Sequence, residues 1–223
     1  MSREAILKAV RDACTRSEAA ADRKAAFRER LAHADRHPLP MQLPANAADL
    51  KERFIELLSR QSAEIVDVPG AHALPAAIAG YLRRHGLPMR LRCGDDPYLG
   101  DLPWQDTPNL ARDTGAARDG DTAGLSRAIA GVAETGTLVL ASGPANPVTL
   151  GFIPETHLVV LHAATIVAAF EDSHALHLAG ADALPRTLNL VSGASRTGDI
   201  GGHIVMGAHG PRRLAVFLVA DND

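Results

Sequence analysis

The sequence predicts an α/β fold with a mainly parallel sheet flanked by helices, preceded by a helical extension. From residue 46 onward, short apolar runs typical of buried strands alternate with segments of helical period. The spacing of strand, helix and strand over residues 64–93 fits a βαβ unit, which requires parallel strands and a right-handed crossover. A length of 223 residues suits one core with an appendage better than two domains.

The N-terminal segment is predicted to be one long helix over residues 2–34, because it is rich in Ala, Arg and Glu and lacks Pro and Gly. Ser2 can cap its first turn. Residues 37–44 contain three prolines, which remove backbone donors and restrain the residues before them. We therefore expect a helix and linker over residues 1–40, and a single α/β domain over residues 41–223.

Each element of that domain follows from a local pattern. Helical period predicts helices from Asn46 or Asp49 to residue 61, over 72–85 and over 165–177. Apolar and β-branched runs predict strands over residues 64–68, 89–93, 127–132, 137–141, 157–162, 187–192 and 214–219. Residues 94–124 are rich in Gly, Asp and Pro and show no sustained period, so an irregular excursion is expected there.

Composition and charge narrow the classes of function. Hydrophobic residues make up 46% of the chain and charged residues 22%, as in ordinary globular proteins. The net charge of −3 argues against a nucleic-acid partner, which requires a clustered positive surface. No run resembles a signal peptide or reaches the length of a membrane helix, so we expect a cytoplasmic protein without a membrane span.

Cysteine usage bears on cofactors. Cys14 and Cys93 are far apart in the sequence and form neither a disulfide framework nor a metal-thiolate pattern. An iron-sulfur cluster usually takes four cysteine ligands. We therefore expect no such cluster to be bound by this chain alone. The motifs of conventional dinucleotide and ATP sites are also missing from the sequence.

A first cluster of candidate site residues covers residues 133–137, which include the predicted turn over residues 133–136, and is followed by Ser-Gly-Pro at residues 142–144. It places Glu134 beside Thr135, Gly136 and Thr137, where a ligand can approach the backbone. Glu134 could act as a base, a nucleophile or an anchor, or it could only bond turn amides. We expect both this cluster and the next to lie where strands end, the usual ligand position in open α/β sheets.

A second cluster covers residues 192–199, with Ser195, Arg196, Thr197 and Asp199 among small residues. Exposed amides, hydroxyls and the Arg196 guanidinium suit an anionic group such as phosphate or carboxylate. An Arg196–Asp199 ion pair that pins the loop is the alternative. Farther on, His209 lies in a glycine-flanked turn that could present it to a cleft as a proton donor or hydrogen-bond partner.

The histidines invite a metal hypothesis, because the sequence contains the pairs His157/His162 and His174/His177. Sites built from histidine alone usually need three convergent ligands or supporting carboxylates. Neither strand nor helix spacing brings these four side chains together, so we predict no metal site.

The two clusters together resemble the LUD domain, as found in the lactate utilization protein C family. The matching string has Ala-Glu-Thr-Gly-Thr-Leu-Val-Leu at residues 133–140 and Pro-x-x-His ending at His157. It continues with Ser-Gly-Ala-Ser-Arg-Thr-Gly-Asp-Ile at residues 192–200 and Gly-Ala-His-Gly-Pro-Arg-Arg-Leu at residues 207–214. The family's loop is expected to end in a glutamate where this chain has Gly201.

This resemblance implies a Rossmann-like, mixed but mainly parallel sheet, similar to the sugar-phosphate isomerase and CoA-transferase fold. It also implies participation in the oxidation of L-lactate to pyruvate. We expect this chain to be an accessory subunit that binds a small anion between Glu134 and the Arg196 loop. The iron-sulfur clusters are then expected on separate partner proteins. The alternative is a stand-alone enzyme that acts on an acyl-CoA or sugar phosphate, with Glu134 as catalytic carboxylate.

Overall fold

A computed structural model describes residues 2–15, 25, 26, 29, 43, 44, 46–173 and 185–220, without the side chains of residues 14, 15, 199 and 200. The chain divides into two compact units, Met1–Pro38 and Leu39–Asp223. In the first unit, helix α1 (Arg3–Thr15) occupies the start of the predicted long helix, and the Ser2 hydroxyl accepts a hydrogen bond from the Ala5 amide at 3.3 Å. Most of the remaining predicted helix and of the proline-rich linker lies outside the described residues.

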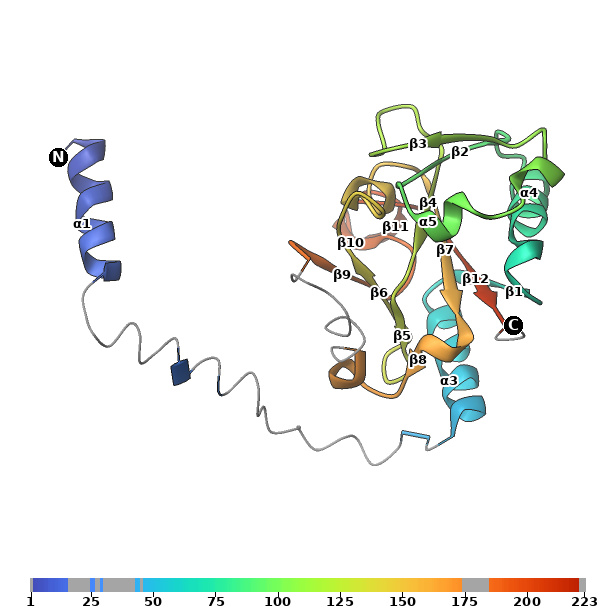
Figure 1. Ribbon diagram of the computed structural model, residues 1–223, viewed down its shortest axis with the longest axis horizontal. Helices are drawn as coiled ribbons and strands as arrows, with labels where there is room; N and C mark the ends of the chain where they lie inside the picture. The colour runs from blue at the N-terminus through green and yellow to red at the C-terminus, as the bar shows by residue number, and fades with distance from the viewer. Residues whose placement is uncertain are drawn as a thin grey trace. The chain divides into compact units, whose positions relative to one another are not determined.

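The second unit is organised around a six-stranded sheet in which every neighbouring pair of strands is parallel (Figure 1). In spatial order, the strands are β1 (Ala63–Val68), β12 (Arg213–Val219), β7 (Thr156–His162), β4 (Ala123–Arg127), β2 (Arg90–Cys93) and β3 (Ala111–Thr114). The central strands β7 and β12 are almost wholly buried. The prediction of an α/β fold with a mainly parallel sheet is therefore confirmed.

Different helices cover the two faces of this sheet. Helix α4 (Leu74–Arg84) packs Ile78 and Tyr81 into a core with Phe217 of β12. Helix α3 (Ala47–Arg60) packs Phe54 and Leu58 into a second core, on the side shared with a smaller sheet. Burial of these side chains supplies the main stabilisation of both layers. Shorter helical segments are η1 (Ala71–Ala73), α5 (Pro97–Gly100), η2 (Trp104–Asp106), η3 (Val148–Gly151) and η4 (Ala163–Thr165).

The start of α3 confirms one of the two predicted positions. The Asn46 side chain accepts a hydrogen bond from the Asp49 amide at 2.9 Å, and it donates to the Asp49 carboxylate. This cap satisfies one of the donors that every helix leaves free at its first turn.

The smaller sheet has four strands in the order β8 (Ile166–Val167), β5 (Ala130–Val132), β6 (Thr137–Ala141) and β9 (Leu188–Val191). Strands β5 and β6 are antiparallel, which confirms the predicted turn over residues 133–136. Gly136 has a φ of +65°, and a Cβ there would lie 2.7 Å from the Leu58 nitrogen. Only glycine therefore lets this turn approach α3 so closely.

Three predicted segments were wrong in part. The irregular excursion contains α5, β3 and the start of β4, which are too short to produce a visible period. The strand predicted over residues 127–132 is split, because the chain leaves the large sheet after β4 and enters the small sheet at β5. Ile166 and Val167 form β8 rather than helix, while residues 170–173 are helical and residues 174–177 lie outside the described part.

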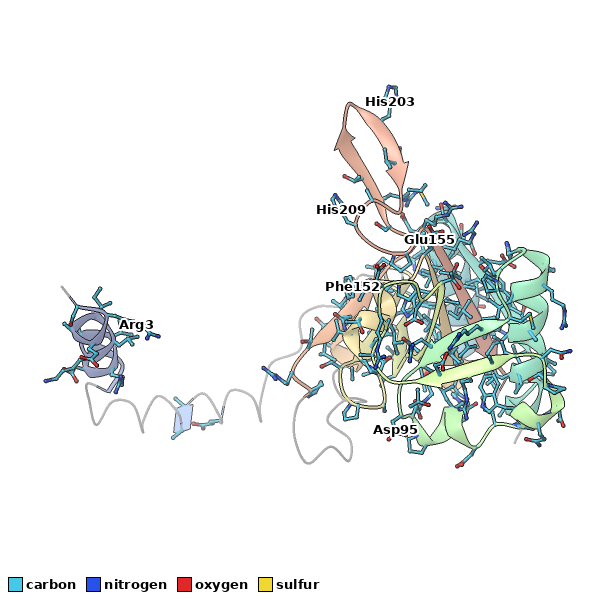
Figure 2. The ribbon with its side chains drawn as sticks, turned by 90° about the horizontal axis from the view of Figure 1, so that it is seen from above. Arg3, Asp95, Phe152, Glu155, His203 and His209 are labelled. Atoms are coloured by element: carbon cyan, nitrogen blue, oxygen red, sulfur yellow. The ribbon has the colours of Figure 1, made fainter. Side chains whose placement is uncertain are left out.

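The segment after β9 contains a β-hairpin where a ligand loop was predicted. Strands β10 (Arg196–Ile200) and β11 (His203–Met206) are antiparallel, and Gly201 and Gly202 connect them with φ values of +62° and +74°. Two consecutive positive φ values are the geometry of a two-residue hairpin turn. Figure 2 shows this arm projecting from the rest of the unit, with His203 at its tip and His209 near its base.

Within the described residues, every helix is too short or too polar to cross a bilayer.

Candidate functional site

The two predicted clusters follow strands of the smaller sheet. Glu134 and its neighbours lie between β5 and β6, and Ser142 comes directly after β6. Ser192 comes directly after β9. Both clusters therefore lie where strands end, as expected, but these strands belong to the smaller sheet and not to the parallel sheet.

The structure nevertheless brings the two clusters together. The Thr137 hydroxyl, which is buried, lies 2.6 Å from the Ser192 hydroxyl and 2.7 Å from that of Thr135. These contacts join residues that are more than fifty positions apart in the sequence. They form a chain of hydroxyl groups between the β5–β6 turn and the loop after β9.

Both clusters also contact the C-terminal end of α3. The Gln61 carbonyl accepts a hydrogen bond from the Ala194 amide at 3.2 Å, and its side-chain oxygen accepts one from the Arg196 guanidinium. Gly193 has a φ of +130°, and a Cβ there would lie 2.4 Å from the Gln61 carbonyl oxygen. The loop after β9 is thus fixed to α3 by its backbone.

The carboxylate of Glu134 is half-buried, and its backbone amide donates to the Ala168 carbonyl at 3.0 Å. Among the described residues, Glu134 and Arg196 form no ion pair. Thr197 is half-buried at the start of β10, and the side chain of Asp199 lies outside the described residues. A ligand shared by Glu134 and Arg196 stays a prediction, and so does the Arg196–Asp199 pair.

A pocket of about 540 Å³ lies beside these clusters. From the predicted set, Ser195 and His209 line it. The rest of the lining comes from the end of η3, from β9 and the loop after it, from the segment before β12, and from the starts of β7 and β12. These residues are Gly151, Phe152, His157, residues 188–194, Gly210, Pro211 and Leu214. His157 and Leu214 are register partners near the amino ends of β7 and β12. The pocket is therefore at the amino edge of the parallel sheet.

His157 is a polar side chain of this pocket that is not among the predicted ligand-binding residues. It is 2% exposed, and its Nε2 lies 3.0 Å from the hydroxyl of Ser126, which is also buried. Burial lowers the pKa of His157 from 6.5 to about 4, because the charged imidazolium would lose its hydration. The ring is therefore neutral at pH 7. A polar residue at the start of an otherwise apolar strand was the available signal.

Backbone contacts fix the opposite wall. The Ser195 amide donates to the Pro211 carbonyl at 2.9 Å, and the Ser195 carbonyl accepts from the Gly207 amide at 2.8 Å. His209 is exposed on this wall. Gly207 has a φ of +80°, in keeping with a role in shaping the turn.

The carboxyl edge of the sheet holds a second polar group that the sequence did not reveal. Asp96, buried at the start of α5, accepts two hydrogen bonds from Arg127 of β4, at 2.7 and 3.2 Å. The guanidinium lies 5.2 Å from the centre of the Tyr98 ring, whose edge packs against His162 at 5.0 Å. Burial raises the pKa of Tyr98.

Metal ligands do not gather in the described part of the chain, where no group of three or more His, Cys, Asp and Glu side chains could hold an ion. His157 and His162 stand at opposite ends of β7, and His174 and His177 lie outside the described residues. Cys93 is buried, and burial raises the pKa of its thiol.

Comparison with known proteins bears out the resemblance. Residues 119–219 match the LUD domain family. An uncharacterized protein of Neisseria meningitidis is 35% identical over 97 residues, and lactate utilization protein C of a Geobacillus strain is 32% identical over 93 residues. These alignments cover 44% and 40% of this chain, and 42% and 39% of the two relatives, so the chain matches about two fifths of their length.

A solved structure extends the likeness beyond the LUD domain. It is the crystal structure of a DUF162 family protein from Deinococcus radiodurans, with a TM-score of 0.59 and 25% identity. The match covers 79% of this chain and 99% of that protein. The match therefore includes a part of the chain that precedes residue 119.

Proposed function

We propose that this protein is an accessory component of L-lactate utilization that supports the oxidation of lactate to pyruvate by separate iron-sulfur proteins. The LUD domain at residues 119–219, with relatives named lactate utilization protein C, is the observation that carries the proposal. The same matched region contains the hydroxyl chain of Thr135, Thr137 and Ser192.

Cysteine chemistry supports this division of labour. Oxidation of lactate to pyruvate removes two electrons and two protons, so a redox group must accept the electrons. This chain has two cysteines, and the thiol of buried Cys93 has a raised pKa, which disfavours the thiolate that binds iron. We assign the electron-carrying clusters to the partner proteins.

The second part of the proposal is a small-anion site around the end of α3. Arg196 offers the cationic donors, and the hydroxyls of Thr137, Ser192 and Ser195 lie on the segments that converge there. The present bond from Arg196 to the neutral Gln61 side chain leaves the guanidinium charge without a carboxylate partner among the described residues. A carboxylate such as lactate would supply that partner.

Reconstitution with purified partners tests the proposal. Lactate oxidation by the iron-sulfur proteins should fall severalfold when this chain is omitted, and the chain should co-purify with them. Undiminished oxidation in its absence would exclude the accessory role. Arg196→Gln should weaken any stimulation, whereas Arg84→Gln, which changes an exposed arginine on α4, serves as the matched control.

A further inference from the structure

The pocket at the amino edge of the sheet has no charged wall. Among the described residues that line it, there is no Asp, Glu, Lys or Arg. Arg196, the cation among the predicted site residues, does not line it. The two histidines are its titratable groups, and His157 is neutral at pH 7 because burial lowers its pKa.

Such a lining discriminates by charge. An anion that entered would lose much of its hydration and meet no cation, which costs several kcal/mol. Apolar walls from Phe152, Leu188, Leu190 and Pro211 instead favour a ligand with an apolar body. A volume of about 540 Å³ is also within the range of pockets for cofactor-sized molecules, and far larger than a hydroxy acid needs.

One polar group in this pocket is fixed in place. The His157 ring is held at Nε2 by Ser126, and it lies 3.2 Å from the position that a Cβ on Gly151 would occupy. A larger residue at position 151 would crowd the ring. The imidazole is therefore presented to the pocket at a set orientation.

We propose that this pocket binds an uncharged, mainly apolar small molecule whose hydroxyl or carbonyl group hydrogen-bonds to His157. The proposal goes beyond the lactate-related function, because the ligand differs from lactate in both charge and size. Its site shares Ser192 and Ser195 with the proposed anion site and is otherwise built from different residues.

A matched pair of aromatic probes tests the charge preference. At pH 7, 2-naphthol is neutral and 2-naphthoate is an anion of similar shape. Titration calorimetry on the full chain should show naphthol binding at least tenfold more tightly than naphthoate. Equal or tighter binding of naphthoate, or no naphthol binding at millimolar concentration, overturns the proposal.

Two exposed apolar residues provide the variants. Leu190 lines the pocket and is 56% exposed, whereas Ile204 on β11 is 75% exposed and lies outside the lining. Leu190→Ser should weaken naphthol binding about fivefold through lost apolar contact, and Ile204→Ser should leave it unchanged. Equal effects of the two changes would place the probe elsewhere and refute the assignment.

Nitrogen NMR of the histidine rings tests whether the ligand hydroxyl hydrogen-bonds to His157. Added naphthol should shift the His157 ring-nitrogen signals, because a new hydrogen bond forms at the imidazole. Shifts confined to the exposed His209 would contradict the proposed orientation. None of these measurements involves lactate or the iron-sulfur proteins, so their failure is distinguishable from failure of the proposed function.

Discussion

The two edges of the parallel sheet differ in how their buried polar side chains are partnered. At the carboxyl edge, Asp96 and Arg127 neutralise each other, and aromatic rings pack around the pair. At the amino edge, His157 is buried, has no charged partner among the described residues and borders a pocket. Figure 2 shows Asp95, beside the first edge, at the opposite end of the unit from His209. A satisfied pair indicates a structural role, whereas a neutral side chain facing a cavity indicates a site for a ligand.

Removing one partner of the carboxyl-edge pair should give the largest effect on stability. Asp96→Ala leaves the Arg127 guanidinium, which is about one-third exposed, without its carboxylate. It also removes the acceptor for the Tyr98 amide. We expect the free energy of unfolding in urea to fall by about 3 kcal/mol.

Asp95 provides the control for that change, since it is the adjacent acid and is exposed. Asp95→Ala should alter the free energy of unfolding by less than about 0.5 kcal/mol. Equal losses for the two variants would mean that the pair is not what stabilises this edge.

Burial of His157 at the amino edge should make the free energy of unfolding depend on pH. The pKa of His157 is about 4 in the folded chain, below its ordinary value of 6.5, so between these values the unfolded chain binds more protons. The stabilisation is complete above pH 6.5 and is lost as the pH falls toward 4. Between pH 7 and pH 5, the free energy of unfolding should drop by about 2 kcal/mol.

Chemical denaturation at several pH values measures this slope. In His157→Asn the part of the slope due to His157 should disappear, whereas His209→Asn, which changes an exposed ring, should retain it. A slope that survives in His157→Asn would show that other groups cause the acid sensitivity.

The fold could be predicted where local pattern and tertiary environment agree. The strands at residues 157–162 and 214–219 are continuous apolar runs because both faces of β7 and β12 are buried, and such runs are visible in sequence. The short strands β3 and β8 were missed because they contain four and two residues, and their pairing partners are distant in the chain. The Gly201–Gly202 pair is typical of a hairpin turn, but the small residues before it favoured the interpretation as a loop.

The candidate site was predictable only in part, because its geometry depends on tertiary contacts. The sequence identified both loops, and the structure links them through Thr137 and Ser192. It gave no sign of Gln61, which holds Ala194 and Arg196 from the end of α3. A strand beginning at His157 could be predicted, but its place beside a pocket depends on the pairing of β7 with β4 and β12.

A smaller effect is expected at the proposed anion site. Arg196→Gln should weaken the binding of lactate about tenfold, because one charge-assisted contact is lost. Thermal unfolding with and without lactate measures it, since a ligand that binds only the folded chain raises the melting temperature. Arg84→Gln should keep the wild-type shift. A lactate-induced shift that persists in Arg196→Gln would move the anion site elsewhere.

The last prediction is that no covalent adduct forms on Glu134, and it distinguishes the accessory role from catalysis by this carboxylate. An enzyme that used this carboxylate as a nucleophile toward CoA thioesters would leave an acyl or CoA adduct on it, and the adduct would be absent from Glu134→Gln. Glu134 lies on the β5–β6 turn and does not line the pocket at the amino edge, so this pocket does not hold a bulky thioester against its carboxylate. We therefore expect mass spectrometry of the full chain, incubated with acetyl-CoA, to show the unmodified mass for wild type and variant alike. A mass increase on the wild type alone would instead favour the stand-alone enzyme.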